Sequence, residues 1–232
     1  MRHWRLQFRH VVSSVLVLIM VVLVWRTAYA LKNSATPDKA NNPRKVAGVV
    51  KPPETCSKSG CHDTPPATCA GKVEILGLPE CYTPGQAYDL SVKVSDANMT
   101  RWGFEVGAQY SEGNDHDYES AGTIDNAAAA RTKKITSADG MRSFITHDPA
   151  SANGDGTYPT QAGSATWNFT WTAPGVGQRQ TQICFYVAGL AADNDEGRSG
   201  DCTYNTKVCL NPCGPVETKK STWGEVKSYY DR

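Results

Sequence analysis

The stretch Trp167-Asn168-Phe169-Thr170-Trp171 places three aromatic side chains at alternate positions, and Ala173-Pro174-Gly175 follows it. Successive side chains of a β-strand point to opposite faces of the sheet, so this spacing predicts a strand with one aromatic, buried face. The Pro-Gly pair predicts the turn that ends it. We interpret these aromatic residues as core packing, which is the usual role of aromatic side chains at strand spacing.

Outside this stretch, several short segments share the same alternation or β-rich composition, and no helical period of 3.6 is found between Cys69 and Cys213. Residues 125–134 are alanine-rich and could form one or two helical turns within a long crossing loop. Seven or eight short strands in about 150 residues indicate an all-β fold, an antiparallel β-sandwich of immunoglobulin or fibronectin type with long loops. The further predicted strands are residues 72–76, 88–94, 102–110, 182–188 and 207–210.

The first 30 residues have the pattern of an export signal. Three arginines precede an apolar run from Val11 to Trp25, and Ala28-Tyr29-Ala30 is a small-x-small cleavage site. A membrane-spanning helix needs about 20 apolar residues, and this run is shorter. We therefore expect cleavage after Ala30 and a periplasmic, cell-surface or extracellular protein. The alternative is that the signal stays uncleaved, in which case it would anchor the protein in a membrane.

The charge and composition of the rest divide it into three parts. Without residues 1–30, 20 basic and 23 acidic residues remain, a net charge near −3 that gives no basic footprint for nucleic acid. Residues 31–53 are polar and proline-bearing and predict a flexible linker. Residues 54–213 are expected to form the sandwich, and residues 214–232 a C-terminal tail.

The segment Cys56-Ser57-Lys58-Ser59-Gly60-Cys61-His62 is the candidate cofactor site. The c-type haem attachment sequence is Cys-x-x-Cys-His, in which the histidine ligates the iron. Four residues separate the thiols here, and Gly60 could let the extra pair bulge outward. Three readings stay open at this point: covalent haem c on Cys56 and Cys61 with His62 as the proximal iron ligand, a disulfide, or a zinc site.

The six other cysteines are candidates for disulfides, because export places thiols where they oxidise. Nearness along the chain predicts a bond between Cys69 and Cys81, closing the first strand and its turn. The remaining four bracket one hairpin and the segment after it, and are expected to pair among themselves. These four are Cys184, Cys202, Cys209 and Cys213.

Six short motifs together carry a family resemblance. In chain order they are Tyr82-Thr83-Pro84-Gly85-Gln86-x-Tyr88, Arg101-Trp102-Gly103-Phe104-Glu105, Ala121-Gly122, Ile145-Thr146-His147, Trp167-x-Phe169-x-Trp171-x-Ala173-Pro174 and Phe185-Tyr186-x-Ala188. The chain resembles a Reeler-type domain over residues 54–210, and more closely the bacterial "choice-of-anchor V" relatives of that domain. The resemblance implies an exported immunoglobulin-like sandwich, and those relatives commonly open with a Cys-x-x-Cys-His-like segment. This chain differs from the family pattern in having six further cysteines.

A haem iron would need a second axial ligand, and His147 is the candidate distal ligand. It ends a predicted strand, and the family pattern also places a histidine there. His116 lies in a run of acids and turn formers and is interpreted as a solvated loop residue. The oxygen-rich stretches 153–156 and 193–197 lack EF-hand spacing and are interpreted as ordinary turns.

No nucleophile elbow, phosphate-binding loop or carboxylate pair is recognisable, so the protein is not expected to be an enzyme. The first functional hypothesis is an exported single-haem, c-type cytochrome-like electron-transfer or haem-bearing surface module with a redox partner protein. The alternative is a cofactor-free, disulfide-stapled extracellular module for adhesion or matrix binding.

Overall fold

The computed structural model describes residues 37–46, 49–51, 53–57, 62, 69–111, 118–195, 197 and 199–214. Within these ranges the chain forms twelve β-strands and no helix. The strands are β1 (Arg44–Val46), β2 (Val49–Lys51), β3 (Lys72–Leu76), β4 (Cys81–Tyr82), β5 (Ala87–Asp96), β6 (Arg101–Tyr110), β7 (Thr123–Asn126), β8 (Thr132–Thr136), β9 (Ser143–His147), β10 (Gly163–Thr172), β11 (Ile183–Ala192) and β12 (Cys202–Pro212).

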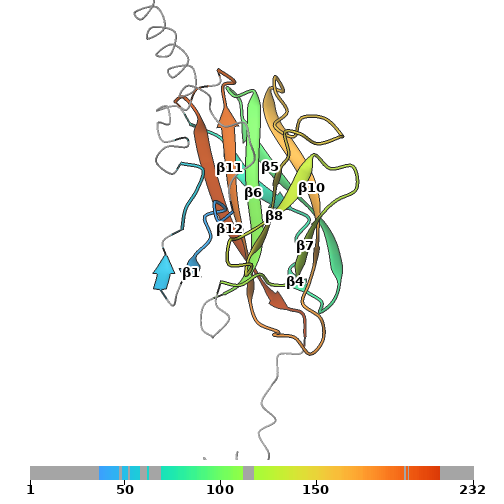
Figure 1. Ribbon diagram of the computed structural model, residues 1–232. Helices are drawn as coiled ribbons and strands as arrows, with labels where there is room; N and C mark the ends of the chain where they lie inside the picture. The colour runs from blue at the N-terminus through green and yellow to red at the C-terminus, as the bar shows by residue number, and fades with distance from the viewer. Residues whose placement is uncertain are drawn as a thin grey trace, which may run out of the picture.

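Two sheets face each other and build the sandwich (Figure 1). One sheet has the strand order β3-β5-β10-β7, and the other has the order β4-β12-β11-β6-β9-β8. Neighbouring strands are antiparallel except β12 and β4, which are parallel. The all-β sandwich predicted from the sequence is therefore confirmed.

The core lies between the sheets and is rich in aromatic rings. Along β10 the buried positions alternate with more exposed ones, and Trp167, Phe169 and Trp171 all point inward. Their rings meet those of the facing sheet, with Phe104 and Trp167 centred 4.6 Å apart and Trp171 and Phe185 5.0 Å apart. Such contacts contribute beyond the apolar area they bury, which confirms the interpretation of these aromatics as core.

Strand β6 departs from the alternating pattern, because its residues 102–109 are all buried. Its inner face packs in the core, whereas its outer face is covered by residues near the N-terminus. Ala40 is fully buried there against Phe144, Cys184 and Tyr186. The first described residues of the predicted linker thus pack on the six-stranded sheet, and in Figure 1 this blue segment runs alongside β12.

Residues 125–134 also differ from the expectation of a helical turn in a crossing loop. They form the end of β7, a tight turn around Ala128 and Ala129, and the start of β8. Thr123 and Ile124 extend the four-stranded sheet by pairing with β10, while β8 pairs with β9 in the other sheet. The connection between the sheets leaves too few residues for a helix.

All six cysteines expected in disulfides are joined, but the predicted pairing was wrong. The bonds are Cys69–Cys202, Cys81–Cys213 and Cys184–Cys209. Cys69 and Cys81 do not pair with each other, because β3 and β4 enter different sheets. β4 lies beside the end of β12, next to Cys213, and Cys69 reaches the start of β12 from the other sheet. Only Cys184–Cys209 stays within the expected group, as a directly opposed pair on β11 and β12.

The part of the chain that the structure describes contains no helix long and apolar enough to cross a membrane. The predicted signal of residues 1–30 and nearly all of the predicted tail, residues 215–232, lie outside the described residues.

Candidate functional site

The cysteine–histidine segment closes on itself beside the start of β12. The main-chain N–H of His62 donates to the carbonyl of Cys56 over 3.1 Å. Nδ1 of His62 lies 2.5 Å from Oδ2 of Asp201, which is buried with 2% of its surface exposed. The carboxylate of Asp201 accepts the Nδ1–H of His62 and fixes the orientation of the imidazole. The other ring nitrogen, Nε2, takes no part in this contact. Metal-ligating histidines commonly have such a carboxylate partner. Cys61 lies outside the described residues.

His147 is a buried, neutral histidine at the end of β9. Its Nδ1 accepts a hydrogen bond from the main-chain N–H of Phe104 over 3.1 Å. Burial lowers the pKa of His147 to about 4, and this effect outweighs the opposing effects of the main-chain carbonyl of Phe104 and of the nearby carboxylates Asp148 and Asp155. Gly103 leaves room for the ring, since a Cβ there would lie 2.9 Å from Cε1 of His147.

The structure does not bring the two predicted iron ligands together. His62 is held at the start of β12, whereas His147 ends β9. β12 and β9 are separated by β11 and β6 in the six-stranded sheet. Three strand spacings amount to about 14 Å, and two axial ligands of one iron lie much closer than that. His116 lies outside the described residues.

A pocket of about 340 Å³ opens at the same end of the sandwich as His147. This volume is at the lower end of the range of small-ligand sites. The pocket combines a cation, a carboxylate, a phenol ring, a hydroxyl group and an amide, and its lining residues are Arg131, Asp155, Tyr158, Pro159, Thr160 and Gln161.

The loop between β9 and β10 builds most of the pocket, and core residues fasten it. The indole N–H of Trp102 donates to the carbonyl of Gln161, and that of Trp167 donates to the carbonyl of Gly156, each over 2.7 Å. These indoles therefore link the aromatic core to the pocket. The loop is held in place by hydrogen bonds of buried groups, which rarely go unpaired.

Arg131 reaches into the pocket from the turn before β8. Its guanidinium lies over the ring of Tyr158, 4.7 Å from the centroid, and its Nε donates to the carbonyl of Asn153 over 2.9 Å. The predicted turn at 153–156 is therefore part of the pocket. The carboxylate of Asp155 is held by Thr157 and by Arg101.

Three non-glycine residues around the pocket have positive φ angles: Ala129 at 56°, Tyr158 at 45° and Thr160 at 72°. Such conformations are uncommon and are found disproportionately at functional sites. The sequence did not reveal this pocket, because its residues carry no periodic pattern or known motif. The glycine-rich turn at 153–156 was the one available signal.

Asp201, the partner of His62, also has acidic neighbours. The pKa of Asp193 is raised by burial and by the neighbouring Asp195 and Asp201. Within the described residues, however, no three histidine, cysteine or acidic side chains are arranged to hold a metal ion. Residues 193–195 form a bend, in agreement with the interpretation of this stretch as a turn.

No protein-family model matches the sequence, and no curated protein matches it. Among solved structures, the chain is similar to the human F-spondin reeler domain, with 17% identity, 67% of this chain and 100% of that chain covered, and a TM-score of 0.39. It is also similar to the sixth cohesin of scaffoldin B from Acetivibrio cellulolyticus in complex with a dockerin (13% identity, 62% and 99% covered, TM-score 0.35). A third is AvmM, which catalyses macrocyclization in alchivemycin A biosynthesis (14% identity, 76% and 98% covered, TM-score 0.38).

Proposed function

We propose that the protein is an exported binding module whose ligand site is the pocket lined by Arg131, Asp155, Tyr158, Pro159, Thr160 and Gln161. The observation that carries the proposal is the way this pocket is built. A positioned guanidinium, a strained rim and a loop tied to two core tryptophans make a preformed concave site. Preformed sites bind with a smaller ordering cost.

The three disulfides support an extracellular role for such a module. Disulfides persist in oxidising environments, so these bonds indicate an extracellular or similarly oxidising location. Cys69–Cys202 ties the two sheets together near the pocket end, and Cys81–Cys213 ties β4 to the end of β12. A sandwich fastened in this way holds the binding site in shape.

The pocket chemistry favours a polar ligand that offers hydrogen-bond acceptors. One face of Tyr158 is covered by Arg131, and the edge contact with Trp167 takes up more of the ring. The ring of Tyr158 therefore supports the guanidinium of Arg131. Contacts with a ligand are left to the polar groups of the pocket. We propose binding rather than catalysis for this site, and an acceptor-rich group of an extracellular polymer or protein as its ligand.

Binding of the purified mature protein to arrays of extracellular polysaccharides and matrix proteins tests this proposal. Arg131→Met and Gln161→Ala remove donors from the pocket and should each weaken a detected interaction at least tenfold. Each variant also loses a hydrogen bond within the loop, which contributes about 0.5–1.5 kcal/mol, so the sandwich should stay folded at the assay temperature. Lys72→Met, on an exposed position of β3, is the matched control. Binding that is equal in all four proteins would place the ligand elsewhere on the molecule.

Covalent haem attachment is the second candidate function, and the His62–Asp201 pair is the observation that favours it. His62 is oriented as a metal ligand would be, Cys56 lies beside it, and a bound haem would supply electron transfer. His147 does not fit as the distal ligand of the same iron. The intact mass of the mature protein separates the candidates, because an attached haem adds its own mass. If the measured mass equals that of the oxidised polypeptide, no haem is attached. The binding module is then the remaining proposal, and it requires no redox partner.

A further inference from the structure

Residues 38–42 lie on the outer face of the six-stranded sheet and begin a segment that we name the strap, which comprises the described residues 38–46, 49–51, 53 and 54. One row of directly opposed residues crosses the sheet beneath it. The strap follows this row, since Lys39 contacts Glu105 and the side chain of Asn41 donates to that of Asn205 over 3.0 Å. From β8 to β12, the row is Lys133, Thr146, Glu105, Ala188 and Asn205.

Glu105 is the central contact between the strap and the sheet. It is fully buried, and its Oε1 accepts the main-chain N–H of Lys39 over 2.6 Å. Its other oxygen, Oε2, is buried and has no hydrogen-bond partner. An ionised carboxylate in this position would lack most of the hydrogen bonds that water gives it, and that loss is costly. The buried position is better suited to the neutral acid.

The strap adds further unpaired polar atoms to this interface. Oδ1 of Asn42 and Nη1 of Arg44 are buried without hydrogen-bond partners. Native proteins leave few such atoms unpaired in permanently closed interiors. These two strap atoms therefore give up hydrogen bonds to water when the strap is docked, which lowers the free energy needed to open it.

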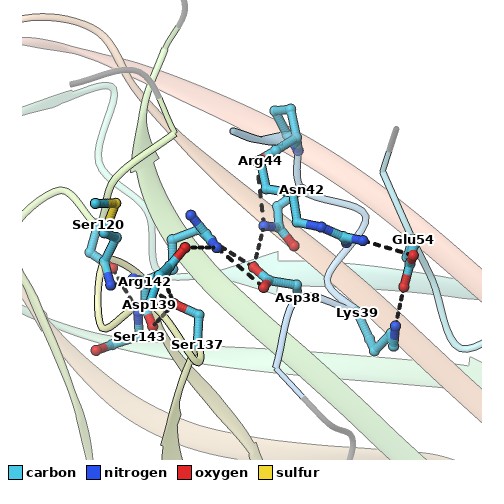
Figure 2. A network of polar contacts seen from close by, with 12 residues as sticks. Asp38, Lys39, Asn42, Arg44, Glu54, Ser120, Ser137, Asp139, Arg142 and Ser143 are labelled. Atoms are coloured by element: carbon cyan, nitrogen blue, oxygen red, sulfur yellow. Dashed lines mark hydrogen bonds and ion pairs between the residues drawn. The ribbon is translucent and has the colours of Figure 1, made fainter. Parts of the chain in front are cut away.

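One ion pair fastens the strap to the rest of the sandwich, and two others brace the strap internally (Figure 2). Asp38 pairs with Arg142, just before β9, over 2.7 Å, and Asp139 holds the same guanidinium over 2.7 Å. Within the strap, Glu54 pairs with Lys39 and with Arg44. Segments held by polar contacts rather than by a large apolar area open at lower free energy than the core.

We propose that docking of the strap on the outer face takes up a proton at Glu105, so that the face is covered at acidic pH and uncovered as the pH rises. The uncovered face would present Phe144, Tyr186 and the Cys184–Cys209 disulfide around Glu105. The occupant of this surface in the closed protein is the strap itself. This proposal does not depend on the pocket function.

The direction of the pH effect follows from the burial of Glu105. Burial raises the pKa of Glu105 from 4.5 to about 8 in the docked state, against the opposing effect of N–H groups of the strap. The released carboxyl has its ordinary pKa, so docking is strongest below about pH 4.5 and weakens until about pH 8. Charged groups on the strap and the surrounding strands that face this region are Asp38, Lys39, Lys133, Asp139, Arg142 and Lys207.

Amide hydrogen exchange of the full mature protein tests the proposal, with Lys39 as the reporter. Its amide is bonded to Glu105 in the docked state, whereas the amide of Asn41 bonds to Glu54 within the strap and reports only the strap's own structure. After correction for the intrinsic pH dependence of exchange, the opening constant of the wild type should rise by up to about tenfold per pH unit between pH 4.5 and pH 8. Amides of β11 report global unfolding and should not follow this trend.

Glu105→Gln keeps an acceptor for the Lys39 amide and removes the proton, so its opening constant should be flat over the same range. Asp38→Asn is the matched control: it should open more at every pH and keep the wild-type slope. A flat wild-type profile overturns the proposal, and so does an unchanged slope in Glu105→Gln. If the strap does not dock in Glu105→Gln, the Asp38→Asn variant decides. A pH dependence of its opening constant like that of the wild type supports Glu105 as the group that takes up the proton. Loss of that pH dependence in Asp38→Asn assigns the proton to Asp38 instead.

Discussion

Nδ1 of His62 lies 2.5 Å from Oδ2 of Asp201, although 139 residues separate them along the chain. The contact joins the cysteine–histidine segment to the residue just before β12 and the Cys69–Cys202 disulfide. It is the observation that fixes where this segment sits, whichever chemistry its cysteines carry.

Asp201→Asn should release His62 without unfolding the sandwich. A hydrogen bond to a charged group contributes about 1.5–3 kcal/mol, so exchange of the His62 amide should accelerate roughly 10- to 100-fold. This amide donates to Cys56 and reports the closed segment. Asp195→Asn, on the neighbouring bend, is the control and should leave the rate unchanged. An unaltered rate in Asp201→Asn would show that the contact does not hold the segment.

The disulfides should differ in their contribution to the free energy of unfolding. Cys81–Cys213 spans 132 residues and Cys184–Cys209 spans 25. The loop-closure entropy of the unfolded chain gives about 5 kcal/mol for the longer loop and about 3.5 kcal/mol for the shorter one. Denaturant titration of the two double Cys→Ala variants measures both losses. A larger loss for Cys184–Cys209 would mean that local packing, rather than chain entropy, dominates.

His147 should make the protein less stable in acid. Its pKa is about 4 when folded and near 6.5 when unfolded. The unfolded chain therefore takes up the proton first, and stability that is complete above pH 6.5 is lost as the pH falls toward 4. His147→Asn should remove up to about 3 kcal/mol of this pH dependence. The comparison of wild type and variant at each pH cancels the opposite trend from Glu105, and parallel stability curves would contradict the assignment.

Gly156→Ala should distort the pocket loop. A Cβ at this position would lie 2.3 Å from the carbonyl oxygen of Arg131 and 2.7 Å from the amide nitrogen of Asp148, both main-chain atoms. Such overpacking typically costs about 1–3 kcal/mol. Thermal unfolding measures the loss, and any binding at the pocket should decrease with it. At Gly175 a Cβ would lie 3.8 Å from Oε1 of Gln178, an ordinary contact, so Gly175→Ala serves as the control.

The local pattern of the sequence was sufficient to predict the fold class and the strands β3, β5, β6, β10, β11 and part of β12, whereas β7 and β8 were not recognised. β3 was predicted with its exact bounds, and the aromatic alternation of β10 correctly identified the inner face. These features depend on residues that are neighbours in the chain, because side-chain alternation follows from the strand backbone itself.

The tertiary structure decided every feature that joins distant residues. It determined which cysteines pair, that Asp201 meets His62 while His147 does not, and that the predicted linker covers Glu105. It also assembled the pocket from two separate loops. The order of strands across a sheet sets these distances, and that order results from the summed packing of the whole core. No short stretch of sequence contains it, since each strand can pair equally well with several neighbours until the core is complete.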